Sequence, residues 1–122
     1  EKPIRWICDD AVKFCEREAR RDSRYDIVLL DPPAYGRGPK GEVWQLFEDL
    51  PAMVELTRAI LSPKPLGVVL TAYSIRSSFF AIHTLLRDAF AGMGGAPANH
   101  RRRHSNFLDT AGGLGSLNAA LF

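Results

Sequence analysis

The chain has 122 residues, of which 46% are hydrophobic, so it can form one domain with a substantial core. Its formal net charge of +2 excludes attraction to nucleic acid through overall charge alone. The sequence contains no apolar run of about 20 residues and no apolar segment behind a basic amino terminus, so we expect neither a membrane span nor a signal peptide. Pairing of its two cysteines, Cys8 and Cys15, is unfavourable within one strand–helix unit, which favours a reducing, cytoplasmic location.

The amino-terminal third has the pattern of a strand, a helix and a strand. Ile4–Cys8 alternates large residues and predicts a strand. Either Asp9 or Asp10 can cap the following segment, Ala11–Arg21, where apolar residues recur at helical spacing. Asp26–Leu30 is rich in branched residues and predicts a strand buried on both faces, as in a parallel sheet. Strand, helix and strand within about 30 residues predict a βαβ unit.

The middle of the chain continues the alternation. Glu42–Leu61 has helical spacing, and Pro51 predicts a kink or a new start within it. Leu66–Tyr73 predicts a third buried strand, and Ser77–Ala91 predicts an amphipathic helix that the following glycines end. Such alternation is typical of a mainly parallel α/β sheet, and we expect one domain over residues 1–122.

The carboxyl-terminal part has a weaker pattern. Asn99–His104 and Leu114–Phe122 are the candidates for two antiparallel edge strands. The basic run Arg101–Arg103 could contact phosphate or form a solvated surface, and the sequence leaves both readings open.

A group of unusual residues follows the central strand. Asp31 lies at its carboxyl end, and Pro32 and Pro33 then fix φ and remove two backbone donors. The stiff backbone carries Tyr35 outward, and glycines 36, 38 and 41 with two cations let the chain turn close to another group. Since ligands of open α/β sheets bind at the carboxyl ends of strands, this stretch is a candidate site.

Asp31-Pro32-Pro33-Ala34-Tyr35 resembles motif IV, (D/N)-P-P-(Y/F), of the class I S-adenosylmethionine-dependent methyltransferases. The longer run Asp31 to Trp44 resembles a bacterial subfamily related to the 23S rRNA 5-methylcytosine methyltransferases. The resemblance covers Ile4 to Ser78 and is looser beyond. It implies a Rossmann-like methyltransferase fold with helices on both faces of the sheet, S-adenosyl-L-methionine as cofactor and RNA, specifically rRNA, as substrate.

The resemblance also implies that the amino-terminal part of the fold is missing. No strand of this chain ends in the glycine-rich turn of that family or in its ribose-binding acid. Ile4–Ala11 is similar instead to a later strand and its adenine-contacting motif. We therefore expect a carboxyl-terminal portion of a catalytic domain, which needs the amino-terminal half as a partner and binds cofactor poorly alone.

For the cofactor, the resemblance implies that the Asp10 carboxylate accepts a hydrogen bond from the adenine amino group. The backbone N–H of Ala11 would meet the adenine ring, and Asp31 would border the same site. The alternative for Asp10 is that it only caps the helix, although capping and contact can coexist.

For catalysis, the resemblance implies that Asp31 and the Pro32 carbonyl hold the target nitrogen. Pro33 completes the stiff turn after the central strand, residues Asp31–Ala34, which we call the elbow. Tyr35 would stack on a base extruded from the RNA. The alternative is a strand-end acid and a turn aromatic with a packing role.

For the substrate, Arg37 and Lys40 could hold phosphates beside Tyr35, and Tyr73 could line the pocket. The alternatives are a solvated loop for the two cations and a core position for Tyr73.

The chain departs from the 5-methylcytosine enzymes at one position. Those relatives use a cysteine nucleophile after the third strand, where this chain reads Leu70-Thr71-Ala72-Tyr73-Ser74. This departure argues against methylation of cytosine C5 and favours a base nitrogen. No Cys/His spacing suggests a metal.

Two other functions make different demands on the sequence. A degenerate or truncated domain could act as a non-catalytic interaction module that pairs through an exposed sheet edge, with a homodimer left open. A dinucleotide-dependent oxidoreductase is disfavoured because its glycine fingerprint and following acid are absent from the sequence.

Overall fold

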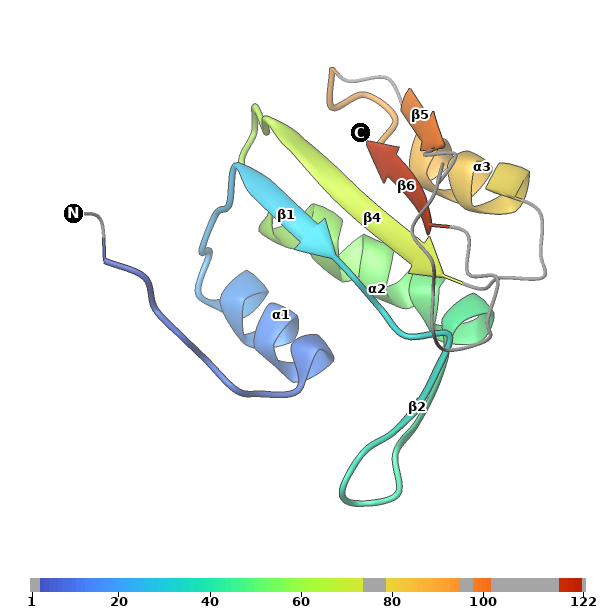
Figure 1. The fold of residues 1–122 in the computed structure, drawn as a ribbon. Coiled ribbons are helices and arrows are strands. Elements are labelled where there is room, and N and C mark those ends of the chain that lie inside the picture. Colours follow the sequence, from blue (N-terminus) through green and yellow to red (C-terminus); the bar gives the residue numbers. More distant parts are fainter. Residues whose placement is uncertain (1–2, 74–78, 95–97, 102–116, 122) are drawn as a thin grey trace.

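A computed structural model of the chain describes residues 3–73, 79–94, 98–101 and 117–121. Four of the described strands form one sheet in the order β1-β4-β6-β5, and β2 and β3 form a separate hairpin (Figure 1). The elements in chain order are α1 (Ala11–Arg20), β1 (Ile27–Leu30), β2 (Tyr35–Arg37), β3 (Val43–Gln45), α2 (Leu46–Ile60), β4 (Gly67–Tyr73), α3 (Phe79–Ala89), β5 (Ala98–Arg101) and β6 (Leu117–Leu121).

The sheet combines one parallel pair with two antiparallel pairs. β1 and β4 run parallel, with Ile27 opposite Gly67 and Leu30 opposite Leu70, and α2 connects them. β6 lies antiparallel between β4 and β5. The predicted α/β class is confirmed, and so is the antiparallel pair, although residues 102–104, 114–116 and 122 of the predicted strands lie outside the described residues.

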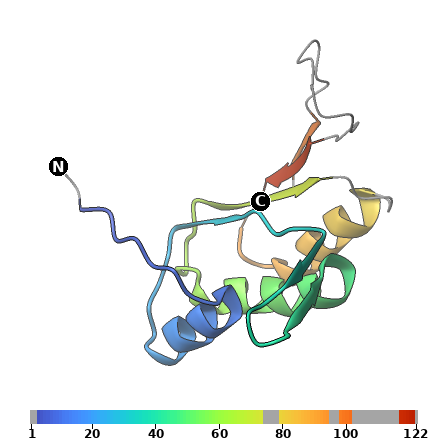
Figure 2. The same cartoon turned by 60° about the horizontal axis from the view of Figure 1, so that its bottom comes forward.

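The three described helices lie together on one face of the sheet (Figure 2). Alternate residues of β1 therefore have different surroundings: Leu30 is buried, whereas Ile27 and Leu29 are 58% and 66% exposed. The prediction that this strand is buried on both faces is wrong within the described residues. The prediction of helices on both faces of the sheet is likewise not met within the described residues. Right-handed crossover connections that all proceed in one direction across a sheet place their helices on the same side of it.

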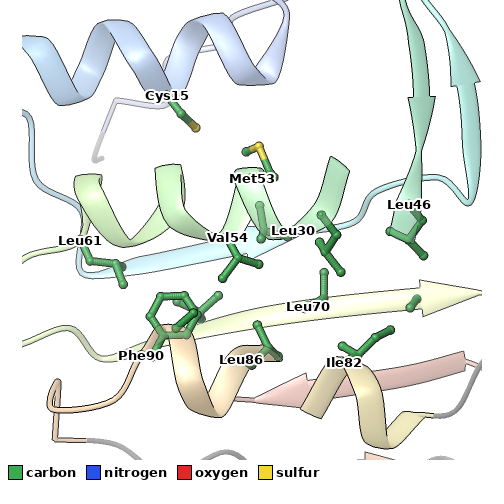
Figure 3. Packing of buried hydrophobic residues seen from close by; sticks show 14 of the residues in the cluster. Cys15, Leu30, Leu46, Met53, Val54, Leu61, Leu70, Ile82, Leu86 and Phe90 are labelled. Atoms are coloured by element: carbon green, nitrogen blue, oxygen red, sulfur yellow. The ribbon is translucent and has the colours of Figure 1, made fainter. Parts of the chain in front are cut away.

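The hydrophobic core lies between this sheet face and the helices (Figure 3). Leu70 of β4 packs in one cluster with Val54 of α2 and with Leu86 and Phe90 at the end of α3, all at most 1% exposed. Burial of each such side chain contributes roughly 1.5–3 kcal/mol. Cys15 of α1 belongs to the same cluster, and both cysteines are free thiols.

The predicted strand Ile4–Cys8 is not formed. These residues lie outside the sheet, with Ile4 73% and Trp6 87% exposed. A strand needs a neighbour to pair with its backbone N–H and C=O groups, and no described strand pairs with this segment. The first βαβ unit is therefore incomplete, and the strand–helix–strand unit of this structure is β1–α2–β4.

The helix predicted from Glu42 begins later, at Leu46, because Val43–Gln45 pairs with β2 as a hairpin strand. The Asp49 carboxylate accepts a hydrogen bond from the Gln45 backbone N–H at 2.6 Å, which favours a helix start at this point. Pro51 lies inside α2 without dividing it, so of the two predicted alternatives, a kink and a new start, the new start is wrong.

The helix predicted over Ser77–Ala91 is observed as α3, although residues 77 and 78 lie outside the described part. Gly92, with φ +83°, follows it as predicted. Across the described helices, none combines the length and the apolar character that a membrane crossing requires.

Candidate functional site

A groove of about 840 Å³ opens beside the carboxyl end of β1. The start of α1, the elbow after β1, the β2–β3 hairpin and the first half of α2 form its walls. Among its lining residues are Asp10, Ala11, Asp31, Pro32 and Arg37. The fold thus brings two acidic segments, separated by about 20 residues of sequence, to one opening.

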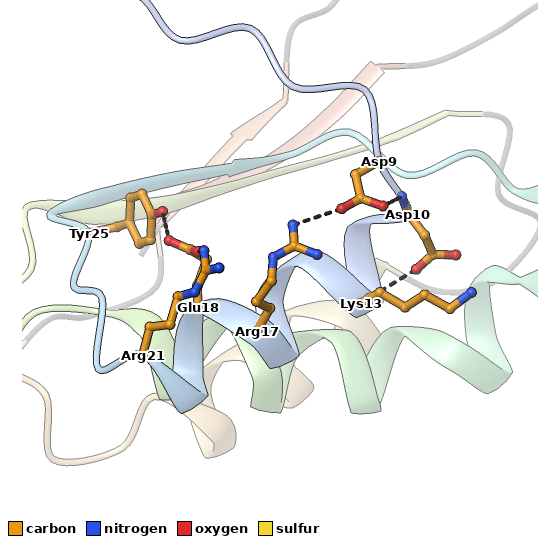
Figure 4. A network of polar contacts seen from close by, with 7 residues as sticks. All are labelled: Asp9, Asp10, Lys13, Arg17, Glu18, Arg21 and Tyr25. Carbon is orange, nitrogen blue, oxygen red and sulfur yellow. Dashed lines mark hydrogen bonds and ion pairs between the residues drawn. The ribbon is translucent and has the colours of Figure 1, made fainter.

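The first acidic segment is the start of α1 (Figure 4). Asp10 is the N-cap, and its Oδ1 accepts a hydrogen bond from the Lys13 backbone N–H at 3.0 Å. Asp9 accepts from Arg17 at 2.7 Å, and this bond, with a second from the Asp10 N–H, holds the pKa of the Asp9 carboxyl below its ordinary value. The Ala11 N–H is one of the first-turn donors that a helix leaves unpaired.

The second acidic segment is the elbow after β1. The Asp31 carboxylate accepts a hydrogen bond from the Thr71 hydroxyl of β4, and the same hydroxyl lies 3.4 Å from the Leu30 carbonyl. The indole Nε1 of Trp44 donates to the Pro33 carbonyl at 2.8 Å. Neighbouring elements therefore hold both sides of the elbow.

The β2–β3 hairpin projects from the body of the domain (Figure 1). Tyr35 is 53% exposed, and its hydroxyl accepts a hydrogen bond from Arg37 Nε at 2.8 Å. At the turn, Gly41 has φ +86°, and the Glu42 carboxylate accepts from the Lys40 backbone N–H at 2.9 Å. Arg37 lines the groove, whereas Tyr35 and Lys40 do not.

The predicted site residues divide into those that line the groove and those that do not. The groove walls include those assigned to the cofactor and the elbow, namely Asp10, Ala11, Asp31, Pro32 and Pro33. Tyr73 belongs to β4, but its side chain lies outside the described residues. Sequence reasoning assigned no role to Trp44, although its position at the end of the D-P-P run was a signal that it belongs to the same unit.

The chemistry of the groove is that of an organic ligand site. Carboxylates and a helix N-terminus supply hydrogen-bonding groups, and Leu50, Met53 and Leu56 supply apolar wall. The described residues contain no group of three or more His, Cys, Asp or Glu side chains that could hold a metal ion.

Comparison with solved structures finds similar folds. The SAM-dependent methyltransferase from Agrobacterium tumefaciens is 51% identical, with a TM-score of 0.81 over 98% of this chain. SMU.776, solved in complex with SAH, is 16% identical with a TM-score of 0.65 over 93% of this chain. M1.HpyAVI, solved in complex with SAM, is 13% identical with a TM-score of 0.50 over 92% of this chain.

The chain spans only part of each of these proteins: 40% of the Agrobacterium protein, 30% of SMU.776 and 50% of M1.HpyAVI. At 16% and 13% identity, the last two show a shared fold alone. No protein-family model and no curated protein matches the chain.

Proposed function

We propose that this chain is part of an S-adenosylmethionine-dependent methyltransferase that modifies a base of RNA. The observation that carries the proposal is the 51% identity, over 98% of this chain, to the SAM-dependent methyltransferase from Agrobacterium tumefaciens. Because the chain spans 40% of that protein, the activity is proposed for the complete gene product.

The groove fits the adenosine part of the proposed cofactor. Asp10 keeps one carboxylate oxygen, Oδ2, to which no described group donates, and this oxygen suits the adenine amino group. The Ala11 N–H next to it suits an acceptor atom of the ring. The volume of about 840 Å³ is within the usual range of ligand pockets. When bound, the cofactor supplies an electrophilic methyl group.

The elbow would position the nucleophile. The Asp31 carboxylate and the Pro32 carbonyl are acceptors that can bind the N–H groups of an exocyclic or ring nitrogen. Two acceptors on one nitrogen set its lone-pair direction, so the elbow accelerates transfer mainly by orientation.

The hairpin would hold the RNA. Tyr35 offers an exposed ring on which an extruded base can stack, and Arg37 and Lys40 offer cations to phosphates. These features favour a nucleic-acid substrate, and the resemblance of residues 31–44 to rRNA enzymes favours rRNA.

The cysteines favour a nitrogen target over cytosine C5. Cys15 is buried in the core, and burial raises the pKa of its thiol, which lowers the fraction of thiolate. Cys8 lies on the segment before α1, away from the elbow sequence. Neither has the features of a nucleophile at the elbow.

The test uses the complete gene product. We expect S-adenosylhomocysteine to bind in isothermal titration and tritiated S-adenosylmethionine to label RNA from a strain that lacks the gene. Asp31→Ala should abolish labelling, while S-adenosylhomocysteine should still bind through Asp10 and the Ala11 N–H. Digestion of the labelled RNA to nucleosides, followed by mass spectrometry, should give an N-methylated base in 23S rRNA. Labelling of protein or DNA in place of RNA would overturn the substrate class, and 5-methylcytidine would overturn the target atom.

One observation favours the alternative of a non-catalytic interaction module. The sheet face opposite the helices carries exposed Ile27 and Leu29, which could bind another protein. Failure of the complete gene product to bind S-adenosylhomocysteine would favour this alternative.

A further inference from the structure

The elbow after β1 presents three successive backbone carbonyls, and the structure distinguishes among them. The Pro33 carbonyl accepts from Trp44 Nε1 at 2.8 Å. The Ala34 carbonyl accepts from the Leu46 backbone N–H at 3.1 Å. No donor within the described part of the chain reaches the Pro32 carbonyl. Pro32 is therefore the residue whose carbonyl remains open, and it lines the groove.

Trp44 is itself firmly held. It lies in β3, opposite Gly36 of β2, so no side chain at position 36 separates the indole from the elbow. The side chain is half-buried and packs against the hydrophobic core. Leu46, two residues later, is 2% exposed and anchors the same segment. Because Trp44 belongs to the hairpin, the hydrogen bond from its indole N–H fixes the elbow relative to the hairpin.

The elbow has little freedom between its anchors. The Thr71 hydroxyl holds Asp31 on one side, and Trp44 holds the Pro33–Ala34 peptide plane on the other. The rings of both prolines fix φ. The Pro32–Pro33 peptide plane lies between Asp31 and the Pro33–Ala34 peptide, which are both held. The direction of the Pro32 carbonyl is therefore set by these two contacts.

We propose that Trp44 is a positioning residue for methyl transfer: by occupying the Pro33 carbonyl it orients the elbow so that the Pro32 carbonyl faces the target nitrogen. This inference rests on the proposed function. Trp44 also lines the groove, but in this role its indole N–H acts on the Pro32 carbonyl through the Pro33–Ala34 peptide and needs no contact with cofactor or substrate. Its loss should lower the rate of the bound complex and leave affinity for both ligands intact.

The test is made in the complete gene product. Trp44→Phe keeps an aromatic ring but removes the N–H, and Leu66→Ala is the control at a 78% exposed position outside the groove, before the amino end of β4. We expect W44F to lower kcat for RNA methylation about tenfold or more, with KM for RNA and the Kd for S-adenosylhomocysteine within about threefold of wild type. L66A should match wild type. A W44F enzyme with wild-type kcat, or one whose loss lies in KM, would overturn the inference.

A second substitution separates the hydrogen bond from the packing of the ring. Benzothienylalanine at position 44 has sulfur where indole has N–H and nearly the same shape, so it should reproduce the kcat defect of W44F without loss of thermal stability. Retention of wild-type kcat by this variant would exclude a role for the hydrogen bond.

A readout without substrate separates this inference from the proposed function. The indole N–H of Trp44, assigned by its absence from the W44F spectrum, should exchange with deuterium far more slowly than the same N–H in the urea-unfolded protein. Rapid exchange would overturn the proposed role of the hydrogen bond between Trp44 and the Pro33 carbonyl, even if the enzyme is active. A wild-type protein with a protected indole that labels no RNA would overturn the proposed function and, with it, the catalytic role of Trp44.

Discussion

The Thr71 hydroxyl on β4 donates a hydrogen bond to the carboxylate of Asp31, which follows β1. The parallel pairing of the two strands places Leu70 opposite Leu30, so the next residue of each strand lies at the same edge of the sheet. The two residues are 40 positions apart in the sequence, so only the folded structure brings them into contact. The backbone pairing of the sheet therefore orients the acid of the proposed active site.

Removal of the Thr71 hydroxyl should slow methyl transfer. Thr71→Val keeps the shape of the side chain but frees the Asp31 carboxylate to rotate, so we expect kcat for RNA methylation to fall about tenfold, or ~1.4 kcal/mol in activation free energy. Thr71→Ser should restore most of the rate. Thr84→Val is the matched control, because the Thr84 hydroxyl is buried without a hydrogen-bond partner among the described residues. An unchanged kcat in T71V would contradict the role of this bond.

Substitutions of Asp10 should separate helix capping from cofactor binding. Asp10→Ala loses both functions, whereas Asp10→Ser keeps a capping oxygen for the Lys13 N–H but is too short to reach a ligand. We expect D10A to lose about 1 kcal/mol of stability, D10S to lose little, and both to bind S-adenosylhomocysteine about tenfold or more weakly. Denaturant unfolding and isothermal titration provide the two readouts. Wild-type affinity in D10S would leave Asp10 with the capping role alone.

The pair formed by buried Glu18 and half-buried Tyr25 should make stability depend on pH. Tyr25 OH donates to Glu18 Oε2 at 2.6 Å (Figure 4), and this bond, followed by one from Ser23, lowers the pKa of Glu18 below its ordinary value of 4.5. The same bond raises the pKa of Tyr25 above 10.0. A lowered carboxyl pKa stabilises the fold above the unfolded-state value, and this stabilisation is lost as the pH falls through the folded-state pKa.

Tyr25→Phe should therefore lower Tm by several degrees near pH 7, and the difference from wild type should shrink as the pH falls below about 4.5. At the alkaline end the raised Tyr25 pKa acts in the opposite direction, so its contribution is lost as the pH rises above about 10. Tyr35→Phe is the control, because Tyr35 is exposed and its hydroxyl accepts from Arg37, with no carboxylate partner in the part of the chain that the structure describes. Melting curves in which Y25F and wild type differ equally at all pH values would contradict the prediction.

The hairpin turn should tolerate no side chain at position 41. Gly41 has φ +86°, where a residue with a Cβ is strained, so Gly41→Ala should cost about 1–2 kcal/mol of hairpin stability and weaken RNA binding. Cofactor affinity should not change, since Gly41 does not line the groove. Gly36→Ala is a control for stability, because a Cβ there would meet its nearest neighbours at ordinary contact distances of 3.6 and 3.8 Å. Equal stability of G41A and G36A would contradict this reading.

Local patterns predicted most elements because each depends on residues close in sequence. Helical spacing over residues 11–21 was sufficient for α1, and the apolar run before Asp31 was sufficient for β1. The predictions failed where a distant partner decides the outcome. Val43–Gln45 has helical spacing with the residues that follow, yet it pairs with β2. Ile4–Cys8 has the pattern of a strand but lies outside the described sheet.

The sequence by itself determined the elbow of this protein: an acid at a strand end, two prolines that fix φ, and an aromatic and glycines beyond them. These are properties of local covalent geometry. Only the tertiary structure decided that Asp10 and Asp31 share one groove, that Thr71 and Trp44 hold the elbow, and that the Pro32 carbonyl stays open. Those relationships arise from parallel strand pairing and from the packing of a hairpin, which join residues that no local pattern connects.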